Sequence, residues 1–124
     1  LAWDGKELWS CDRRAGKIYR HHPGKELMVD AEYRSPGPSP SGLCWDGQNL
    51  WSLDAETKRV YRHRMDTNLS VEAVYEFKGI EKERLTGLAW DGENLWTVSR
   101  DTNRIHRYPL KRLKEVKPSK EDGV

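Results

Sequence analysis

The 124-residue chain has little of what would tie it to a disulfide framework, a membrane or a polyanion. Its two cysteines, Cys11 and Cys44, are too few for a disulfide scaffold or a thiolate metal site, so we expect both to pack as small apolar residues. No apolar run approaches the roughly 18 residues that span a bilayer. The 22 Lys and Arg nearly balance the 20 Asp and Glu, which predicts neither nucleic acid nor membrane as a partner. The cellular compartment stays open.

Motifs for catalysis and metal binding are also missing. The sequence has no Gly-rich phosphate loop, nucleophile elbow, paired-cysteine zinc pattern or helix with two metal-binding histidines. It has one Phe but six Trp and five Tyr, in a chain that is 35% hydrophobic and 34% charged. This composition predicts thin layers packed by large flat side chains, and it gives no reason to expect a cofactor.

The strongest feature that is present is an internal repeat. Leu-x-Trp-Asp-Gly occurs at residues 1–5, 43–47 and 88–92, and each copy continues with Leu-Trp and then with a β-branched residue, an aromatic residue and Arg. A period of about 40–45 residues is that of one propeller blade. We therefore predict an all-β chain of three four-stranded blades, at 1–42, 43–87 and 88–116, followed by a frayed tail at 117–124.

Each copy has the pattern of strands joined by polar turns. Asp-Gly supplies a hairpin turn, because Gly tolerates positive φ and Asp bonds its neighbouring backbone. Third strands are predicted at 17–21, 59–63 and 104–108, and fourth strands at 27–33 and 71–77, where β-branched and aromatic residues dominate. In the third copy the fourth strand is weak. Only residues 110–116 are available, and their charges fit a helical turn or a loose tail equally well.

Packing explains the repeated residues most simply. They are Trp3, Trp9, Trp45, Trp51, Trp90 and Trp96, the aspartates Asp4, Asp46 and Asp91, and the glycines Gly5, Gly47 and Gly92. Sugar stacking by Trp and a calcium-binding ring of Asp are the alternatives. A residue that recurs in every blade is better explained by inter-blade packing or by the hairpin. We interpret the four histidines, His21, His22, His63 and His106, as exposed or half-buried strand residues rather than metal ligands.

The string Gly-Leu-x-Trp-Asp-Gly-x-x-Leu-Trp-x-x-Asp, followed by Ile-Tyr-Arg, resembles the blade of bacterial propellers related to the glutamine cyclotransferase-like, YVTN and NHL-repeat groups. The resemblance covers residues 1 to about 109. It implies the fold but no single function, because those groups include a cyclase, lyases, lactonases, lectin-like proteins and interaction modules. A WD40 blade fits less well, since its early Gly-His pair is missing and Trp-Asp here opens the blade.

Three blades cannot close a ring, because closed propellers have about four to eight. An open array would leave faces rich in Trp and Leu in water. We expect a second copy of the chain to complete a six-bladed ring with two-fold symmetry. The alternative is that further blades of a longer chain complete the ring, and the missing initial Met favours it.

Departures from the repeat indicate where function lies, because packing explains only what is the same in every copy. A second turn joins the second and third strands of each copy, at 12–16, 54–58 and 100–103, on the same face as the connectors between blades. Ser99, next to the third of these turns, stands where the other copies have Asp12 and Asp54. The contact candidates on that face are Arg13, Arg14, Glu56, Arg84, Arg100 and Asp101, although a solvated loop surface would carry such charges too. The sequence thus favours a non-enzymatic binding or scaffolding module. The alternatives are a lyase, lactonase or cyclotransferase whose central site needs the complete ring, and a glycan-binding lectin.

Overall fold

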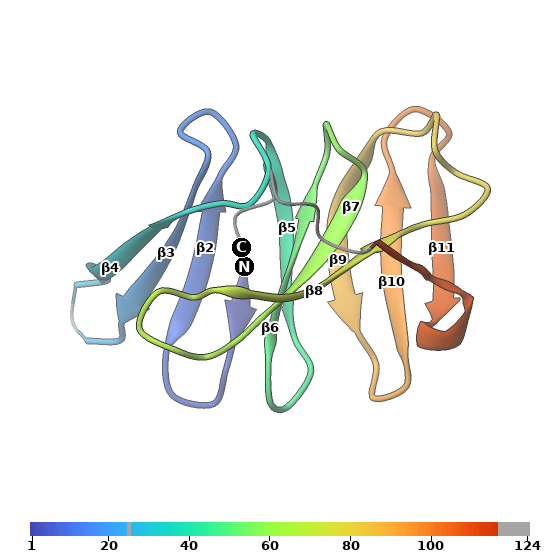
Figure 1. The fold of residues 1–124 in the computed structure, drawn as a ribbon. Coiled ribbons are helices and arrows are strands. Elements are labelled where there is room, and N and C mark those ends of the chain that lie inside the picture. The colour runs from blue at the N-terminus through green and yellow to red at the C-terminus, as the bar shows by residue number, and fades with distance from the viewer. Residues whose placement is uncertain (25, 117–124) are drawn as a thin grey trace.

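The computed structural model describes residues 1–24 and 26–116, which form antiparallel strands in three sheets that lie side by side (Figure 1). The predicted tail at 117–124 lies outside the described residues. The first sheet has the order β1 (Ala2–Trp3), β2 (Leu8–Asp12), β3 (Lys17–His22), β4 (Met28–Arg34). The second sheet contains β5 (Pro40–Trp45), β6 (Leu50–Asp54), β7 (Arg59–His63) and β8 (Val71–Glu76), and the third contains β9 (Leu85–Trp90), β10 (Asn94–Ser99) and β11 (Arg104–Pro109). None of the described residues form a helix long and apolar enough to cross a membrane.

The segment after β11 does not add a fourth strand to the third sheet, so that expectation is wrong. It forms a 3-10 turn, η1 (Leu110–Arg112), and then β12 (Lys114–Val116), which pairs antiparallel with β8. The second sheet therefore has five strands and the third has three. Leu113 supplies the physical reason, because its side chain is only 7% exposed in the core between these two sheets. The charged neighbours of Leu113 remain at the surface.

The Asp-Gly hairpins form as predicted, and one aspartate oxygen organises each turn. Gly47 has φ +100°, a left-handed conformation that favours glycine. Asp46 Oδ1 accepts the backbone N–H groups of Gln48 and Asn49 at 2.8 and 2.7 Å. Its Oδ2 accepts the indole N–H of Trp51 at 2.7 Å. The same clamp recurs in the other copies, as Asp4 with Trp9 at 2.9 Å and Asp91 with Trp96 at 2.6 Å.

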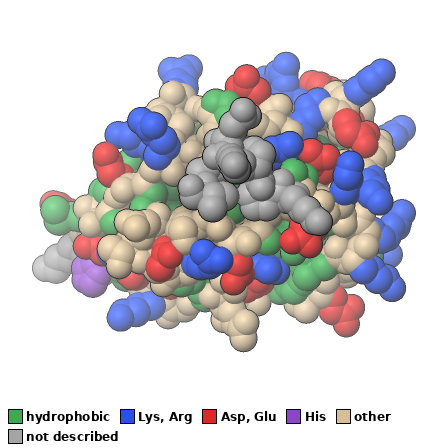
Figure 2. All heavy atoms as spheres, viewed as in Figure 1, with side chains coloured by type: hydrophobic (Ala, Val, Ile, Leu, Met, Phe, Trp, Pro, Cys, Tyr) green, Lys and Arg blue, Asp and Glu red, His purple; other side chains and the backbone are tan. Residues whose placement is uncertain are grey.

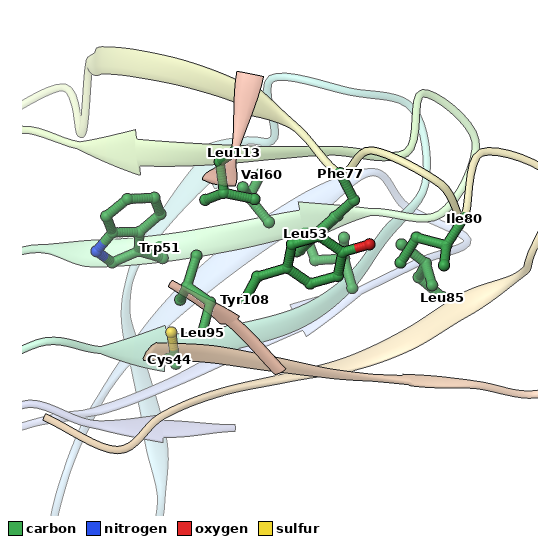
Figure 3. Close-up of a cluster of buried hydrophobic side chains, with 10 residues drawn as sticks. All are labelled: Cys44, Trp51, Leu53, Val60, Phe77, Ile80, Leu85, Leu95, Tyr108 and Leu113. Carbon is green, nitrogen blue, oxygen red and sulfur yellow. The ribbon is translucent and has the colours of Figure 1, made fainter. Parts of the chain in front are cut away.

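Apolar residues from neighbouring sheets form the core, which lies in the two joints between the sheets. In the first joint the cluster consists of Ala2, Trp9 and Ile18 from the first sheet with Leu43, Leu50 and Leu69 from the second. The second joint holds Cys44, Trp51, Leu53 and Val60 of the second sheet against Leu85, Leu95 and Tyr108 of the third, with Phe77, Ile80 and Leu113 from the connecting segments (Figure 3). Blade-on-blade packing therefore explains most of the repeated apolar positions.

Candidate functional site

The turns and connectors that follow β2, β4, β6, β8 and β10 lie at one end of the sheets, along the upper edge of Figure 1. We call this surface the connector face, and we define it as residues 12–16, 34–39, 54–58, 77–84 and 100–104. All six contact candidates from the sequence lie on it with exposed side chains: Arg13, Arg14, Glu56, Arg84, Arg100 and Asp101. They are spread over three blades rather than gathered at one point.

A buried carboxylate holds the connector face together at the second blade. Asp54 is only 2% exposed, and its Oδ1 accepts the backbone N–H of Ser39 at 2.6 Å. Its Oδ2 accepts the N–H groups of Glu56 and Thr57 at 3.1 and 2.7 Å, so one side chain joins the β4–β5 connector to the β6–β7 turn. A Cβ on Gly37 would overlap with Asp54 Cγ, which explains a glycine there. Asp54 is therefore a structural residue and not a free acid.

The third blade obtains its carboxylate from a different segment, which accounts for Ser99. Glu83, on the β8–β9 connector, accepts a hydrogen bond from the Thr102 hydroxyl at 2.7 Å and contacts His106 Nε2 at 3.0 Å. The bond from Thr102, supported by His106 and Ser99, lowers the pKa of Glu83 despite some desolvation. In the third blade Glu83 of the connector bonds residues of the blade. In the second blade the direction is reversed, because Asp54 of strand β6 bonds the connector. Ser99 is only 3% exposed, and Glu83 takes over the carboxylate role that Asp54 has in the second blade.

A hollow on this face lies where the first blade meets the connector to the second. It has a volume of about 360 Å³ and is lined by Arg14, Ala15, Gly16, Arg34 and the Ser-Pro-Gly-Pro segment at 35–38. Ser35 N–H donates to Gly16 O at 2.9 Å, which ties the two walls together. Arg14 was among the candidates, but Arg34 was not. The sequence could have indicated Arg34, because it lies at the end of β4, directly before a proline-rich connector.

The connector face is more basic than the rest of the chain. It has nine Lys and Arg, namely Arg13, Arg14, Arg34, Lys58, Lys78, Lys82, Arg84, Arg100 and Arg104, against six Asp and Glu. Two of those acids, Asp54 and Glu83, are committed to the contacts above, so Asp12, Glu56, Glu81 and Asp101 are the exposed ones. Lys and Arg side chains are visible along the upper edge in Figure 2. Since the whole sequence carries only +2, this face holds the positive surplus.

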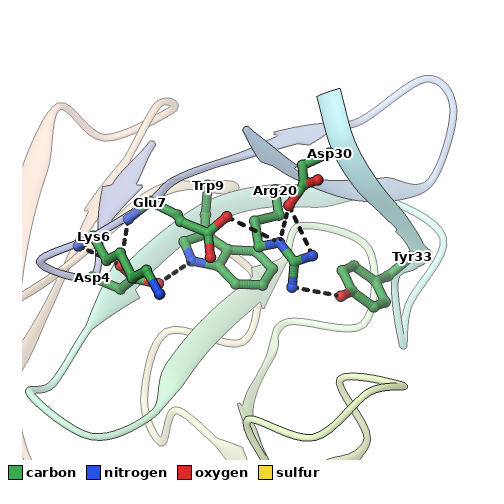
Figure 4. A network of polar contacts seen from close by, with 7 residues as sticks. All are labelled: Asp4, Lys6, Glu7, Trp9, Arg20, Asp30 and Tyr33. Carbon is green, nitrogen blue, oxygen red and sulfur yellow. Dashed lines mark hydrogen bonds and ion pairs between the residues drawn. The ribbon is translucent and has the colours of Figure 1, made fainter. Parts of the chain in front are cut away.

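Arginine and aromatic residues away from this face form outer networks within single blades. In the first blade, Arg20 donates to Asp30 at 3.0 Å, lies 3.2 Å from Glu7, and reaches the hydroxyl of Tyr33 (Figure 4). Tyr33 stacks on Trp9 with ring centroids 6.0 Å apart. In the second blade the guanidinium of Arg62 lies 5.6 Å from the Trp51 ring and bonds Glu72. These contacts close the outer part of the first and second blades over Trp9 and Trp51.

The histidines are more buried than the sequence predicted at one position. His63 is only 1% exposed, with Nε2 2.8 Å from Ser52 Oγ and Nδ1 3.0 Å from Leu69 O. Desolvation lowers its pKa, and a neutral ring satisfies both contacts. The exposed or half-buried reading is therefore wrong for His63, whereas it holds for His21, which contacts Ser10 at 2.6 Å. In both blades the serine lies 11 residues before the histidine, and the antiparallel register of the two strands brings the two side chains together. This spacing was the signal available in the sequence.

The cysteines differ from each other in burial, and no metal centre is formed by the described part of the chain. Cys44 is 6% exposed, and desolvation raises the pKa of its thiol to about 12. Cys11 is only half-buried, and both thiols are free. Within residues 1–24 and 26–116, no group of three or more His, Cys, Asp or Glu is arranged to hold a metal ion.

Comparison with known proteins finds similarity in structure only. No protein-family model and no curated protein sequence matches the chain. Solved structures do match, among them hydrazine synthase from Kuenenia stuttgartiensis, with a TM-score of 0.66 and 15% identity over 92% of this chain and 32% of that one. Virginiamycin B lyase from Staphylococcus aureus matches with a TM-score of 0.64 and 18% identity over 94% of this chain and 39% of the lyase.

Glutaminyl cyclase from Myxococcus xanthus is also similar, with a TM-score of 0.50 and 14% identity over 94% of this chain and 72% of the cyclase. The lyase and the cyclase are propellers, so the propeller fold predicted from the repeat is confirmed. The chain spans less than two fifths of the length of the first two structures. At these identities the likeness concerns the fold alone.

Proposed function

We propose that the chain is a non-enzymatic binding module that takes an acidic protein segment along its connector face. The observation that carries this proposal is the distribution of charge. The connector face has nine basic and six acidic residues, which leaves a surplus of three positive charges (9 − 6) on it. The remaining residues of the sequence include 13 Lys and Arg and 14 Asp and Glu, so they are almost neutral. A positive surplus confined to one face attracts an acidic partner to that face.

The hollow between the first blade and its connector is the best anchor for such a segment. Arg14 and Arg34 lie on its wall and offer planar guanidinium groups, which bind carboxylates in a bidentate manner. Its volume of about 360 Å³ is at the lower end of the range for small-ligand pockets, so it can admit a short part of a segment but not a folded domain. Arg13 is partly committed, because its Nε donates to Ser39 Oγ at 3.1 Å. We therefore assign the main contact to Arg14 and Arg34.

An acidic polypeptide fits this face better than a nucleic acid does. Single-stranded nucleic acids are bound by basic grooves that also expose aromatic rings for base stacking. The connector face has one aromatic residue, Phe77, and it is 3% exposed. The exposed acids Glu56, Glu81 and Asp101 interrupt the basic residues, which disfavours a continuous phosphate backbone and suits a segment of mixed sequence.

The proposal is tested by fluorescence anisotropy with a labelled octaglutamate peptide, with an octaglutamine peptide and a dT8 oligonucleotide as comparison probes. We expect octaglutamate to bind most tightly at low salt and to lose affinity as salt rises. The double substitution Arg14→Glu and Arg34→Glu should weaken octaglutamate binding at least tenfold. Lys6→Glu with Lys111→Glu is the matched control, since both lysines are exposed and lie outside the connector face.

Three results would overturn the proposal. One is an equal loss of octaglutamate binding in the Lys6 and Lys111 control, because the attraction would then be general. Another is tighter binding of dT8 than of octaglutamate at matched salt, which would identify a nucleic-acid surface. Absence of measurable octaglutamate binding at millimolar peptide and low salt would also count against it.

The alternative with support is a propeller enzyme whose site lies in the central opening of a complete ring. Its support is the fold shared with a lyase and a glutaminyl cyclase. Stabilisation of the protein by a divalent cation in a thermal-shift screen would favour this alternative. A lectin that uses the second tryptophan of each blade has less support, because Trp9 and Trp51 are 2% and 0% exposed.

A further inference from the structure

The two joints between neighbouring sheets use the same two kinds of surface. One sheet contributes a forward face, which is defined by the positions of Trp9 and Ile18 in the first sheet and by the equivalent Trp51 and Val60 in the second. The next sheet contributes a rear face. Its positions are Leu43 and Leu50 of the second sheet with Leu69 on the β7–β8 loop, and Leu88 and Leu95 of the third sheet. Each joint is therefore one forward face against one rear face.

The forward face of the third sheet has no such cover within the described chain. Ile105 is 69% exposed, whereas the equivalent Ile18 and Val60 are both 0% exposed. Val98 is 37% exposed, and the equivalent Leu53 is 0%. The repeat supplies apolar side chains at these places, but nothing described packs on them. Large apolar residues exposed together on one face are typical of an interaction surface.

The rear face of the first sheet is likewise not covered by any described part of the chain. Leu27 is 53% exposed, whereas the equivalent Leu69 is 5% exposed inside the first joint. Leu1 is 81% exposed against 2% for Leu43, and Trp3 is 52% exposed. The chain thus ends in an open rear face on one side and an open forward face on the other.

A glycine at the inner strand supports the same conclusion. A Cβ on Gly42 would lie 2.9 Å from Leu88 N and 3.1 Å from the carbonyl carbon of Gly87, so the joint between β5 and β9 requires a glycine there. Gly87 occupies the equivalent place in the third sheet and has no positive φ that would require glycine. A Cβ on Gly87 would meet no backbone atom, only a methyl group of Val98 at 3.2 Å. Gly87 is thus suited to the close approach of another inner strand.

We propose that a second copy of this chain covers both open faces, so that two chains form a closed ring of six blades. The forward face of each third sheet, with Val98 and Ile105, would receive the rear face of the partner's first sheet. The two new joints are then identical and are related by a two-fold axis, as in most soluble homo-oligomers. A copy of this chain is the occupant because it carries both complementary faces, with the residue types already used in the two internal joints.

This inference does not depend on what the connector face binds, since none of the residues that define the two open faces lies on it. The test is the solution mass of the 124-residue chain at micromolar to 100 μM concentration, measured by light scattering and sedimentation. We expect about twice the 14.5 kDa of one chain. Ile105→Glu should shift the mass to one chain and leave the far-UV spectrum unchanged, because Ile105 is exposed in a single chain. Met65→Glu, at another exposed apolar residue on the β7–β8 loop, is the matched control and should remain dimeric.

A mixing experiment tests which faces meet. Ile105→Lys alters only the forward face and Leu27→Glu alters only the rear face, so each variant alone has two damaged joints per dimer. A mixed dimer has one unaltered joint and one joint in which Lys opposes Glu. We expect the two variants to be monomeric separately and to dimerise when mixed.

Three results would overturn the proposal. A monomeric wild-type chain at 100 μM would mean that the complementary faces come from elsewhere, such as further blades of a longer chain. A mass that keeps growing with concentration would indicate an open head-to-tail array instead of a closed pair. A dimer unaffected by Ile105→Glu, or a mixture of the two variants that stays monomeric, would place the interface on other surfaces.

Discussion

Asp46→Ala isolates the contribution of the aspartate clamp, because the same clamp occurs in a buried and in an exposed setting. In the second blade Asp46 receives the indole N–H of Trp51, whose side chain is 0% exposed. In the third blade Asp91 receives the indole of Trp96 at an exposed place. The contacts from Trp96 and from the Asn94 and Glu93 backbone hold the pKa of Asp91 well below its usual range. The two clamps thus have the same hydrogen-bond geometry and differ in how deeply the tryptophan is buried.

The expected loss follows from what Asp46→Ala leaves unpaired. The Trp51 N–H sits in the joint between the second and third sheets, where a donor without a partner costs about 2 kcal/mol. The backbone N–H groups of Gln48 and Asn49 lie in a surface turn and can bond water, so their loss adds about 1 kcal/mol. We expect the free energy of unfolding to fall by about 3 kcal/mol for Asp46→Ala. Asp91→Ala should cost clearly less, because water replaces every contact.

Urea unfolding followed by far-UV circular dichroism, at one fixed protein concentration, measures both losses. Asp46→Asn is the informative third variant. Its amide has a single oxygen, which can accept either from the indole or from the turn, so we expect an intermediate loss. An Asp91→Ala loss as large as that of Asp46→Ala would refute the role of burial. Stability of Asp46→Asn equal to wild type would refute the need for two accepting oxygens.

Two further predictions concern the joints. Gly42→Ala should lower the free energy of unfolding by about 1–3 kcal/mol, because the new Cβ would lie 2.9 Å from the backbone N of Leu88. Gly24→Ala is the control in the same urea assay, and it should be near neutral because the nearest atom would be 3.7 Å away. His63 has a pKa lowered by burial, so below its ordinary value of about 6.5 the unfolded chain binds a proton that the folded chain excludes. Stability should therefore fall as pH decreases from about 6.5 to 5, by up to about 1.4 kcal/mol per pH unit, and a pH series in which His63→Gln keeps the full wild-type slope would contradict this.

The hairpins and the order of strands were predictable because each depends on residues close in sequence. Asp46 and Gly47 determine their own turn, and the spacing of Trp51 from Asp46 brings the indole to the carboxylate. The same pattern occurs in all three copies of the repeat, so the prediction rested on three independent turns. The connector face followed from the alternation of up and down strands, which needs only the strand count.

The end of the third blade was not predictable in this way, because it depends on contacts distant in sequence. Residues 110–116 have charges at positions that suit a surface strand of the second or of the third sheet. Their own pattern therefore does not predict the strand with which they pair. Leu113 decides the outcome by filling the joint between the second and third sheets, which places β12 beside β8. His63 was missed for the same reason. Its burial depends on Ser52 and on the carbonyl of Leu69 across the strands, and neither is visible from the histidine alone.

Ser99 shows how a departure from a repeat can be misread as a sign of function. The second blade uses Asp54 to hold a connector, and the third blade meets the same need with Glu83 from the connector itself. The change at position 99 is therefore compensated within the blade and leaves no unexplained acid. Such compensation is absent at the hollow, where Arg14 and Arg34 line an open space and the turn and connector backbones already bond each other. Exposed charge beside an open surface is a better guide to a partner than a departure from the repeat, and Arg14 and Arg34 are two of the exposed basic residues on the connector face.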